Sequence, residues 1–235
     1  MMLLGIETAT TVCAAAVVRD GVLLAEELVD ERNVHAEKLM GMVDAAFRRS
    51  GSTLEQMAGI AVSIGPGSFT GLRIGLSVAK GLSYASAKPV IPVPTLQGMA
   101  QKAADTVGDS EGIDAVLPLL DARRGDVYCA LYRLTKGSLS PVWDQRVMAL
   151  HAVAVAIRDR RVLVTGDARH ALERLLRDQV PENWHQVHFA TDDVSRCSAA
   201  AVAYIGEGLL RQGKSYDPGL LEPQYLRDFD TTTPP

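Results

Sequence analysis

Cysteine is scarce in this chain of 235 residues, and the cysteines that it has are scattered. Cys13, Cys129 and Cys197 lie far apart and form no Cys-x-x-Cys pair. Zinc clusters and disulfide frameworks need several cysteines at defined spacings, so this spacing argues against both. We therefore expect reduced thiols, as is usual for a protein of the cytosol.

The chain also lacks an excess of basic residues. Lys and Arg number 24 against 28 Asp and Glu, which gives a formal net charge of −4. A protein that binds nucleic acid unaided needs clustered Lys and Arg to neutralise phosphates. The acidic balance argues against such a protein, and any work on RNA would need the charge of a partner.

Long uncharged hydrophobic runs are missing as well. The most apolar stretch, residues 69–87, carries Arg73 and Lys80, whereas a membrane span needs ~18 uncharged residues. Residues 1–7 contain no basic side chain and end in Glu7, which is not the pattern of a signal peptide. We expect a soluble, cytoplasmic protein that makes no contact with membranes.

What remains is an ordinary globular composition, with 47% hydrophobic and 22% charged residues. Hydrophobic periodicity and turn signals predict strands and helices in both halves of the chain. The first half is predicted to hold strands at 3–7, 12–18, 22–29, 59–64 and 89–93, and helices at 34–49, 69–86 and 95–104. The second half is predicted to hold strands at 115–120, 126–134, 139–148 and 162–165, and helices at 149–158, 168–178 and 198–211.

The two halves share one pattern at their starts. In each, the first strand ends in an acidic residue, Glu7 or Asp121, and leads through a small turn into a hairpin that contains glycine. This architectural duplication predicts an α/β fold of two lobes that face each other across a cleft. We place the first lobe at residues 1–106 and the second at 107–235, with the last helix and the tail able to pack back on the first lobe.

Two carboxylates at a cleft suggest one function. Glu7 and Asp121 could hold hydrated Mg²⁺ beside a nucleotide phosphate, as in a stand-alone ATP-dependent kinase or ATPase. Phosphate sites also use backbone N–H groups of Gly-rich turns. Here the turn after Glu7 has no Gly, and the turn after Asp121 carries two arginines. The alternative is that both acids merely end their strands, and the residues alone leave the choice open.

A distinctive segment, residues 63–75, holds a Gly-Pro-Gly loop between a predicted strand and a predicted helix. The loop resembles a phosphate cradle, but no Lys-Ser or Lys-Thr pair follows at the spacing of a Walker loop. In the helix, small side chains recur every fourth residue and form a stripe of Gly71, Gly75, Ala79, Ser83 and Ala87. Such a stripe lets another helix approach closely, either inside the domain or on a partner.

The predicted helix at 34–49 is apolar over a wide arc, which favours a partner surface made of both helices. On that hypothesis, a bulky residue at Gly75 or Ala79 should abolish association and leave the fold intact. His35 lies in the first of these helices, but Leu39 stands four residues on, where a second metal ligand would lie. Neither a metal site nor a Ser-His-Asp or Gly-x-Ser-x-Gly nucleophile is predicted.

Four segments together resemble one known family. They are Leu4-Gly5-Ile6-Glu7-Thr8-Ala9, the block at residues 64–75, Leu120-Asp121-Ala122-Arg123 with Val127-Tyr128, and Glu222-Pro223-Gln224-Tyr225-Leu226-Arg227. In this order and over nearly the whole chain, they resemble the TsaB (YeaZ) family. Its members are accessory subunits of the bacterial machinery that makes threonylcarbamoyladenosine in tRNA.

The resemblance implies a two-lobed fold of the actin, Hsp70 and sugar-kinase (ASKHA) type, with a mixed sheet in each lobe. It also implies a catalytic partner of the same fold, TsaD, which holds a metal through a His-x-x-x-His helix and transfers threonylcarbamoyl to the adenosine next to the anticodon. Because this chain has His35 but Leu39, the resemblance implies a subunit that is not an enzyme on its own. Its nucleotide cleft would be eroded, at Glu7, Thr8, Asp121, Arg123 and Gly166.

The family also suggests how this chain would assemble. The two helices would pair with TsaD, or with a second copy of the chain when TsaD is absent, through His35, Leu39, Met42, Val43, Ala46, Phe69, Gly71, Leu72, Gly75, Leu76, Ala79 and Ser83. The resemblance further implies recruitment of the ATPase subunit TsaE and only indirect contact with tRNA. No cofactor or metal is expected on this chain alone, while the complex would use ATP, Mg²⁺ and the metal held by TsaD.

Overall fold

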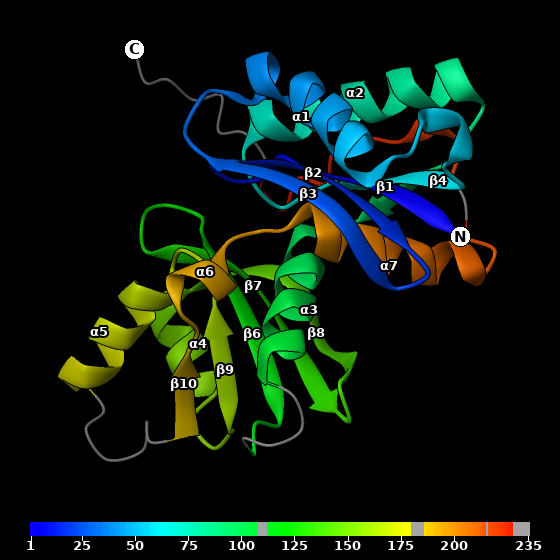
Figure 1. The fold of residues 1–235 in the computed structure, drawn as a ribbon. Helices are drawn as coiled ribbons and strands as arrows, with labels where there is room; N and C mark the ends of the chain where they lie inside the picture. Colours follow the sequence, from blue (N-terminus) through cyan, green and yellow to red (C-terminus); the bar gives the residue numbers. More distant parts are fainter. Residues whose placement is uncertain (108–111, 180–185, 215, 228–235) are drawn as a thin grey trace, which may run out of the picture.

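Two mixed, five-stranded sheets form the framework of the chain (Figure 1). The computed structural model describes residues 1–107, 112–179, 186–214 and 216–227. The first sheet has the order β3-β2-β1-β4-β5, with β1 at Met2–Glu7, β2 at Val12–Arg19, β3 at Val22–Asp30, β4 at Gly59–Ser63 and β5 at Val90–Val93. The second has the order β10-β9-β6-β7-β8, with β6 at Ala115–Asp121, β7 at Asp126–Thr135, β8 at Ser138–Ala149, β9 at Val162–Thr165 and β10 at Val187–Phe189.

The two sheets repeat one strand topology. β1 pairs antiparallel with β2 and parallel with β4, just as β6 pairs antiparallel with β7 and parallel with β9. In each sheet the strand that comes first in the chain ends at an acid. β1 ends at Glu7, which lies opposite Ala14 of β2, and β6 ends at Asp121, which lies opposite Val127 of β7. The predicted duplication into two α/β lobes is confirmed.

Two long helices cover the outer face of the first sheet: α1 at His35–Ser50 and α2 at Phe69–Ser86 (Figure 1). α1 ends at Gly51, which adopts the left-handed conformation (φ 62°) that favours glycine. The N–H of Gly51 donates to the carbonyl oxygen of Arg48 (3.2 Å). α2 begins after Ser68, whose side-chain oxygen accepts a hydrogen bond from the N–H of Gly71 (3.2 Å).

Two further helices, α3 (Thr95–Val107) and α7 (Ala199–Arg211), each pack on the sheet formed by the other half of the chain. α3 contacts β6, β7, β8 and β9 of the second sheet, whereas α7 lies across β1, β2 and β4 of the first. One core cluster joins both sheets through α3, because Ala14, Met99 and Val116 pack into it together. The division that we placed at residue 106 therefore does not hold for α3, which contacts the strands of the second sheet and shares a core with Ala14 of the first.

The second lobe is completed by α4 (Leu150–Ala156), α5 (Arg169–Gln179) and the short α6 (Asp192–Ser195). The predicted strands and helices are present, with ends shifted by a few residues. β10 and α6 were not predicted, because an element of three or four residues shows no periodicity. Among the described residues, none of the helices combines the length and the apolar character that crossing a membrane requires.

Candidate functional site: an interlobe cleft and a helical face

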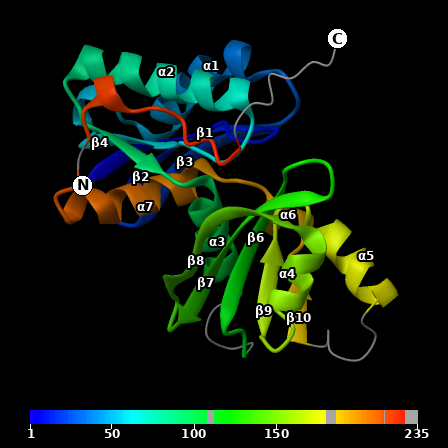
Figure 2. The same cartoon turned by 180° about the vertical axis from the view of Figure 1, so that it is seen from behind.

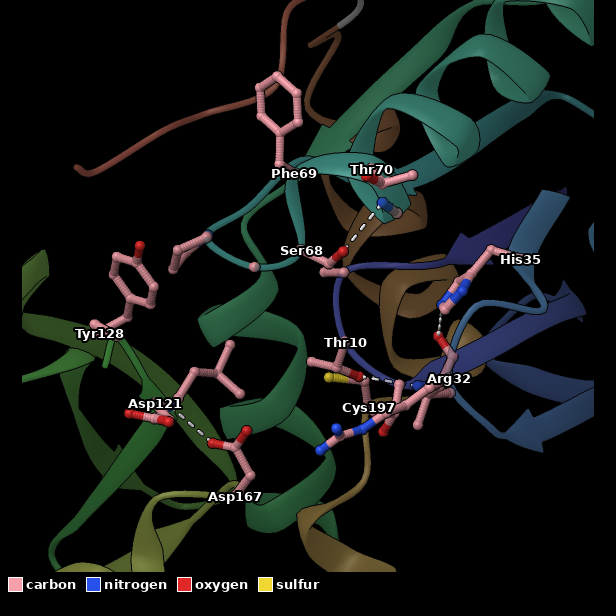
Figure 3. A pocket seen from close by; sticks show the side chains of 18 of the residues that line it. Thr10, Arg32, His35, Ser68, Phe69, Thr70, Asp121, Tyr128, Asp167 and Cys197 are labelled. Carbon is pink, nitrogen blue, oxygen red and sulfur yellow. Dashed lines mark hydrogen bonds between the residues drawn. The ribbon is translucent and has the colours of Figure 1, made fainter. Parts of the chain in front are cut away.

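A cleft of about 1280 Å³ opens between the lobes. Its first wall comes from the turn after β1, the start of α1 and the loop before α2, and its second wall includes Asp121, Tyr128 and Asp167 (Figure 3). The tail also lines the cleft, through Gln224, Tyr225, Leu226 and Arg227. The cleft therefore forms where the starts of the two halves face each other.

The glycines of the Gly-Pro-Gly loop and of α2 let the turn after β1 approach the helix. A Cβ atom at Gly67 would lie 2.1 Å from the carbonyl oxygen of Ala9, and one at Gly71 would lie 2.1 Å from that of Thr8. At Gly75, a Cβ atom would lie 2.2 Å from Oγ1 of Thr8. Real Cβ contacts are never so short, so this packing requires residues without side chains. The glycines of the small-residue stripe are therefore covered by the turn after β1, within the first lobe.

We predict that Gly71→Ala and Gly81→Ala change stability in opposite directions. The first adds a methyl group against a backbone carbonyl, which should cost roughly 1–3 kcal/mol of the free energy of unfolding. At Gly81 a Cβ atom meets nothing within 4 Å, so alanine should add about 1 kcal/mol through its higher helix propensity. Urea unfolding of both variants measures the difference. Equal effects would contradict the account of the stripe.

Glu7 is buried and does not line the cleft. Its Oε1 accepts a hydrogen bond from the N–H of Ala9 (2.6 Å), so the carboxyl group braces the turn after β1. Burial raises the pKa of Glu7 from 4.5 to about 7, although the hydrogen bonds from Ala9 and Ser63 act in the opposite direction. The expectation that Glu7 and Asp121 face each other across the cleft is wrong, because Glu7 points into the core.

This buried carboxyl group predicts a pH dependence of stability. The folded chain holds the Glu7 proton more tightly than the unfolded chain, so the free energy of unfolding should fall by about 3 kcal/mol between pH 4.5 and pH 7 and then level off. Glu7→Gln keeps an acceptor for Ala9 but cannot ionise, so it should remove this slope and be the more stable protein at pH 8. Urea unfolding from pH 4.5 to 8 measures the free energy of unfolding of both proteins at each pH, with the exposed Glu37→Gln as control. A slope that persists in Glu7→Gln would contradict the assignment.

On the second-lobe wall, Asp121 is joined by a second acid, Asp167, that the sequence did not single out. Oδ1 of Asp167 accepts a hydrogen bond from the N–H of Asp121 (2.9 Å), and Oδ1 of Asp121 accepts one from the N–H of Arg123 (2.8 Å) (Figure 3). Burial raises the pKa of Asp167. β6 and β9 are parallel neighbours, so their carboxyl ends meet at one edge. The parallel pairing of these two strands would have predicted Asp167, which follows β9, beside Asp121 at the end of β6.

Two other predicted cleft residues have structural positions. Thr8 is buried beneath α2, and its Oγ1 has no hydrogen-bond partner among the described residues. Gly166 has a φ of 102°, and a Cβ atom there would lie 2.0 Å from the carbonyl oxygen of Leu119. Neither residue lines the cleft, whereas Asp121 and Arg123 do. Of the five residues predicted at the cleft, Asp121 and Arg123 therefore line it, while Glu7, Thr8 and Gly166 do not.

Arginines contribute to the cleft from distant parts of the chain, which is why the sequence did not reveal them. Arg169 is buried and donates to the carbonyl oxygens of Gly166 (2.9 Å) and Ala190 (3.0 Å). Arg32 reaches the cleft from the loop before α1 (Figure 3). Basic as well as acidic side chains therefore line the cleft.

His35 serves the fold of the first lobe. Its ring is buried, and Nε2–H donates to the carbonyl oxygen of Val12 (3.1 Å) (Figure 3). Leu39, one turn later, packs into the core cluster of the same lobe. Within the described ranges, no group of three His, Cys, Asp or Glu residues is placed to hold a metal ion.

Most of the residues that we expected on a partner surface lie inside the first lobe. The buried residues of the two helices are His35, Leu39, Val43, Ala46, Gly71, Leu72, Gly75, Leu76, Ala79 and Ser83. They are buried within the single chain and offer little surface to a partner on the outer side of the two helices, so this part of the prediction is corrected. Met42 is half-buried and packs against the same core, and the ring of Phe69 lies 5.2 Å from that of Tyr225.

Several apolar side chains that α1 and α2 leave accessible lie on their facing flanks, whereas the exposed Tyr84 lies on the other flank of α2, near Gly219. Lys38 and Arg49 of α1 pair with Glu31 and Glu27 at β3 (both 2.6 Å), so the opposite flank of α1 faces α2. Helical spacing puts Met40 and Phe47 on that opposite flank.

The matching flank of α2 carries Ile74, Val78 and Leu82. Met40 is 49% exposed, while Phe47 and these three residues of α2 are half-buried. We call these five residues the α1–α2 face.

A family model matches most of the chain. It is the model of TsaD, described as tRNA N6-adenosine threonylcarbamoyltransferase, and it matches residues 29–232. The chain belongs to this family.

Relatives and solved structures named TsaB or YeaZ are among the proteins that this chain resembles. The "tRNA threonylcarbamoyladenosine biosynthesis protein TsaB" of Escherichia coli K12 is 39% identical over 133 residues, which are 57% of this chain and 55% of that protein. The protein of the same name from Bacillus subtilis 168 is 29% identical over 180 residues, or 76% of each chain. The match thus spans little more than half of the E. coli protein.

YeaZ from Pseudomonas aeruginosa superposes with a TM-score of 0.80 at 26% identity, over 96% of this chain and 99% of that chain. The ROK hexokinase from Thermus thermophilus, at 15% identity and a TM-score of 0.50 over 88% of this chain and 99% of that one, shares the fold alone. The resemblance to TsaB (YeaZ) proteins and the two-lobed, sugar-kinase-like fold are confirmed.

Proposed function

We propose that this chain takes part in threonylcarbamoyladenosine biosynthesis in tRNA, as a non-catalytic subunit that pairs with a TsaD-type catalytic subunit. The α1–α2 face carries the proposal. Partly accessible apolar side chains from two neighbouring helices gather there, on a first lobe whose other face is covered by α7. Accessible apolar surface of this kind is typical of a protein interface.

The geometry of α2 suits a helical partner. Ser77 and Gly81 are exposed beside Val78 and Leu82, and a Cβ atom at Gly81 meets nothing within 4 Å. Small residues beside larger apolar ones let a helix approach and interdigitate. We infer that the same face takes a second copy of this chain when the catalytic subunit is absent.

The cleft supports a non-catalytic role. Catalysis with Mg²⁺ and a nucleotide needs carboxylates that reach the ligand, and Glu7 instead braces a buried turn. Leu39 stands in the core, where a His-x-x-x-His helix would have its second ligand. In the proposed assembly, the partner binds the metal, ATP and Mg²⁺ serve the complex, a TsaE-type ATPase joins it, and tRNA contacts this chain only indirectly.

Gly81→Arg tests the face directly. The long charged side chain should block the approach of a partner and leave folding unimpaired, because the helix gains propensity and no atom is displaced. We expect at least a tenfold loss of affinity for the TsaD-type subunit of the same cell, or about 1.4 kcal/mol, by calorimetry.

Gly208→Arg is the matched control. Gly208 is a helical glycine on α7, on the other side of the sheet, and it too has nothing within 4 Å of a Cβ atom. Binding should be unchanged in this variant. Undiminished binding by a folded Gly81→Arg protein would refute the proposed interface.

An ATP-turnover assay separates the proposal from the stand-alone kinase or ATPase. The purified chain with Mg²⁺ should turn over no ATP above background, and adding the TsaD-type and TsaE-type subunits with tRNA should give modification that depends on this chain. Mg²⁺-dependent turnover by the chain alone, reduced in Asp121→Asn, would support an independent enzyme instead.

A further inference from the structure

The segment after α7 runs back along the first lobe beside α2 (Figure 2), and its last described residues reach the interlobe cleft. Tyr216 forms an isolated bridge with Val90 at the edge of the first sheet, and the short helix Pro218–Leu220 lies beside α2. Residues 224–227 then line the interlobe cleft. We call residues 224–227 the strap.

The strap is anchored to the first lobe at the loop before α2. The N–H of Gln224 donates to the carbonyl oxygen of Ile64 (2.6 Å). A Cβ atom at Gly65 would lie 2.4 Å from the carbonyl oxygen of Gln224, so the glycine makes room for the strap. Nε of Arg73 donates to the hydroxyl oxygen of Tyr225 (3.1 Å), and the ring of Tyr225 packs against Phe69.

The guanidinium of Arg73 also lies 3.6 Å above the centre of the Phe69 ring. A cation over an aromatic face is attracted by the ring, so Phe69, Arg73 and Tyr225 form one connected anchor.

The strap is anchored to the second lobe at the β6–β7 turn. Arg227 donates to the carbonyl oxygen of Ala122 (2.8 Å) and to the carboxylate of Asp126. These two residues close the turn, since the N–H of Ala122 donates to the carbonyl oxygen of Asp126 (3.0 Å). The side-chain amide of Gln145 on β8 donates to that of Gln224. Both partners of the ion pair are about two-thirds shielded from solvent, which strengthens a charged hydrogen bond.

We propose that the strap fixes the separation of the two lobes along this side of the cleft. Elsewhere the lobes meet through the shared core at α3, through two hydrogen bonds between Thr95 at the start of α3 and Gly65 (2.8 and 3.1 Å), and through an ion pair between Arg196 and Asp30 (3.2 Å). None of these contacts involves the β6–β7 turn. The strap joins that turn to the loop before α2, so its release would let the cleft open. The inference concerns this chain alone and does not depend on the partner proposed above.

A strap acts only while both of its ends are held. Cutting the first-lobe anchor with Tyr225→Ala, or the second-lobe anchor with Arg227→Ala, should therefore release the lobes to the same extent. Cutting both ends should release them no further. Side chains that merely stabilise their own lobes would instead give additive effects.

The separation can be measured between spin labels by electron–electron double resonance. Ala85→Cys on α2 and Arg174→Cys on α5 place one exposed label on each lobe. The native thiols are buried, and burial raises the pKa of Cys13 and of Cys129 to about 11 and that of Cys197 well above 9, so they should stay unlabelled. Arg161→Ala is the control, because it breaks a two-bond pair with Asp114 within the second lobe.

The parent protein and Arg161→Ala should give the same narrow distance distribution. Tyr225→Ala, Arg227→Ala and the double variant should share one broader or longer distribution. Distances unchanged in all three, or a double variant that differs from both single ones, would overturn the proposal. Circular dichroism of each variant verifies that both lobes remain folded.

Discussion

The close approach between the turn after β1 and helix α2 is the constraint on which the first lobe depends. Carbonyl oxygens of Thr8 and Ala9 occupy the space where side chains of Gly71 and Gly67 would otherwise lie. The contact brings the start of α2 to the cleft and presses the small-residue stripe against the chain's own backbone. A partner is therefore left with the flanks of α1 and α2, where Met40, Val78 and their neighbours remain accessible.

The secondary structure and the duplication could be predicted because their signals are local. Hydrophobic periodicity, glycine turns and acids at strand ends each act within a few residues. The stripe shows the limit of such signals. A row of small residues says that something approaches closely, but the identity of the neighbour depends on a turn far away in the sequence. The packing of the last helix, α7, on the first lobe was expected, but that of α3 on the second sheet was hidden for the same reason, since either sheet could cover an apolar helix.

The cleft shows the same limit at the level of chemistry. Glu7 and Asp121 occupy equivalent strand ends, yet one carboxyl group is buried under the turn that it braces and the other faces the cleft beside Asp167. Residue type alone could not separate these two environments. The tail was recognisable as a motif, but its anchors at Phe69 and Asp126 became visible only when the two lobes were placed together. Asp121 and Asp167 thus charge the second wall of the cleft, whereas Glu7 of the first lobe does not reach it.

Hydrogen exchange of this chain, alone and saturated with the TsaD-type subunit, tests the central claim most directly. The account predicts slower exchange in residues 36–47 and 73–82, because a partner that covers the α1–α2 face shields the backbone of both helices. It predicts no comparable protection in α4 and α5 of the second lobe. Protection confined to those second-lobe helices, or an unchanged α1 and α2 at saturation, would contradict it.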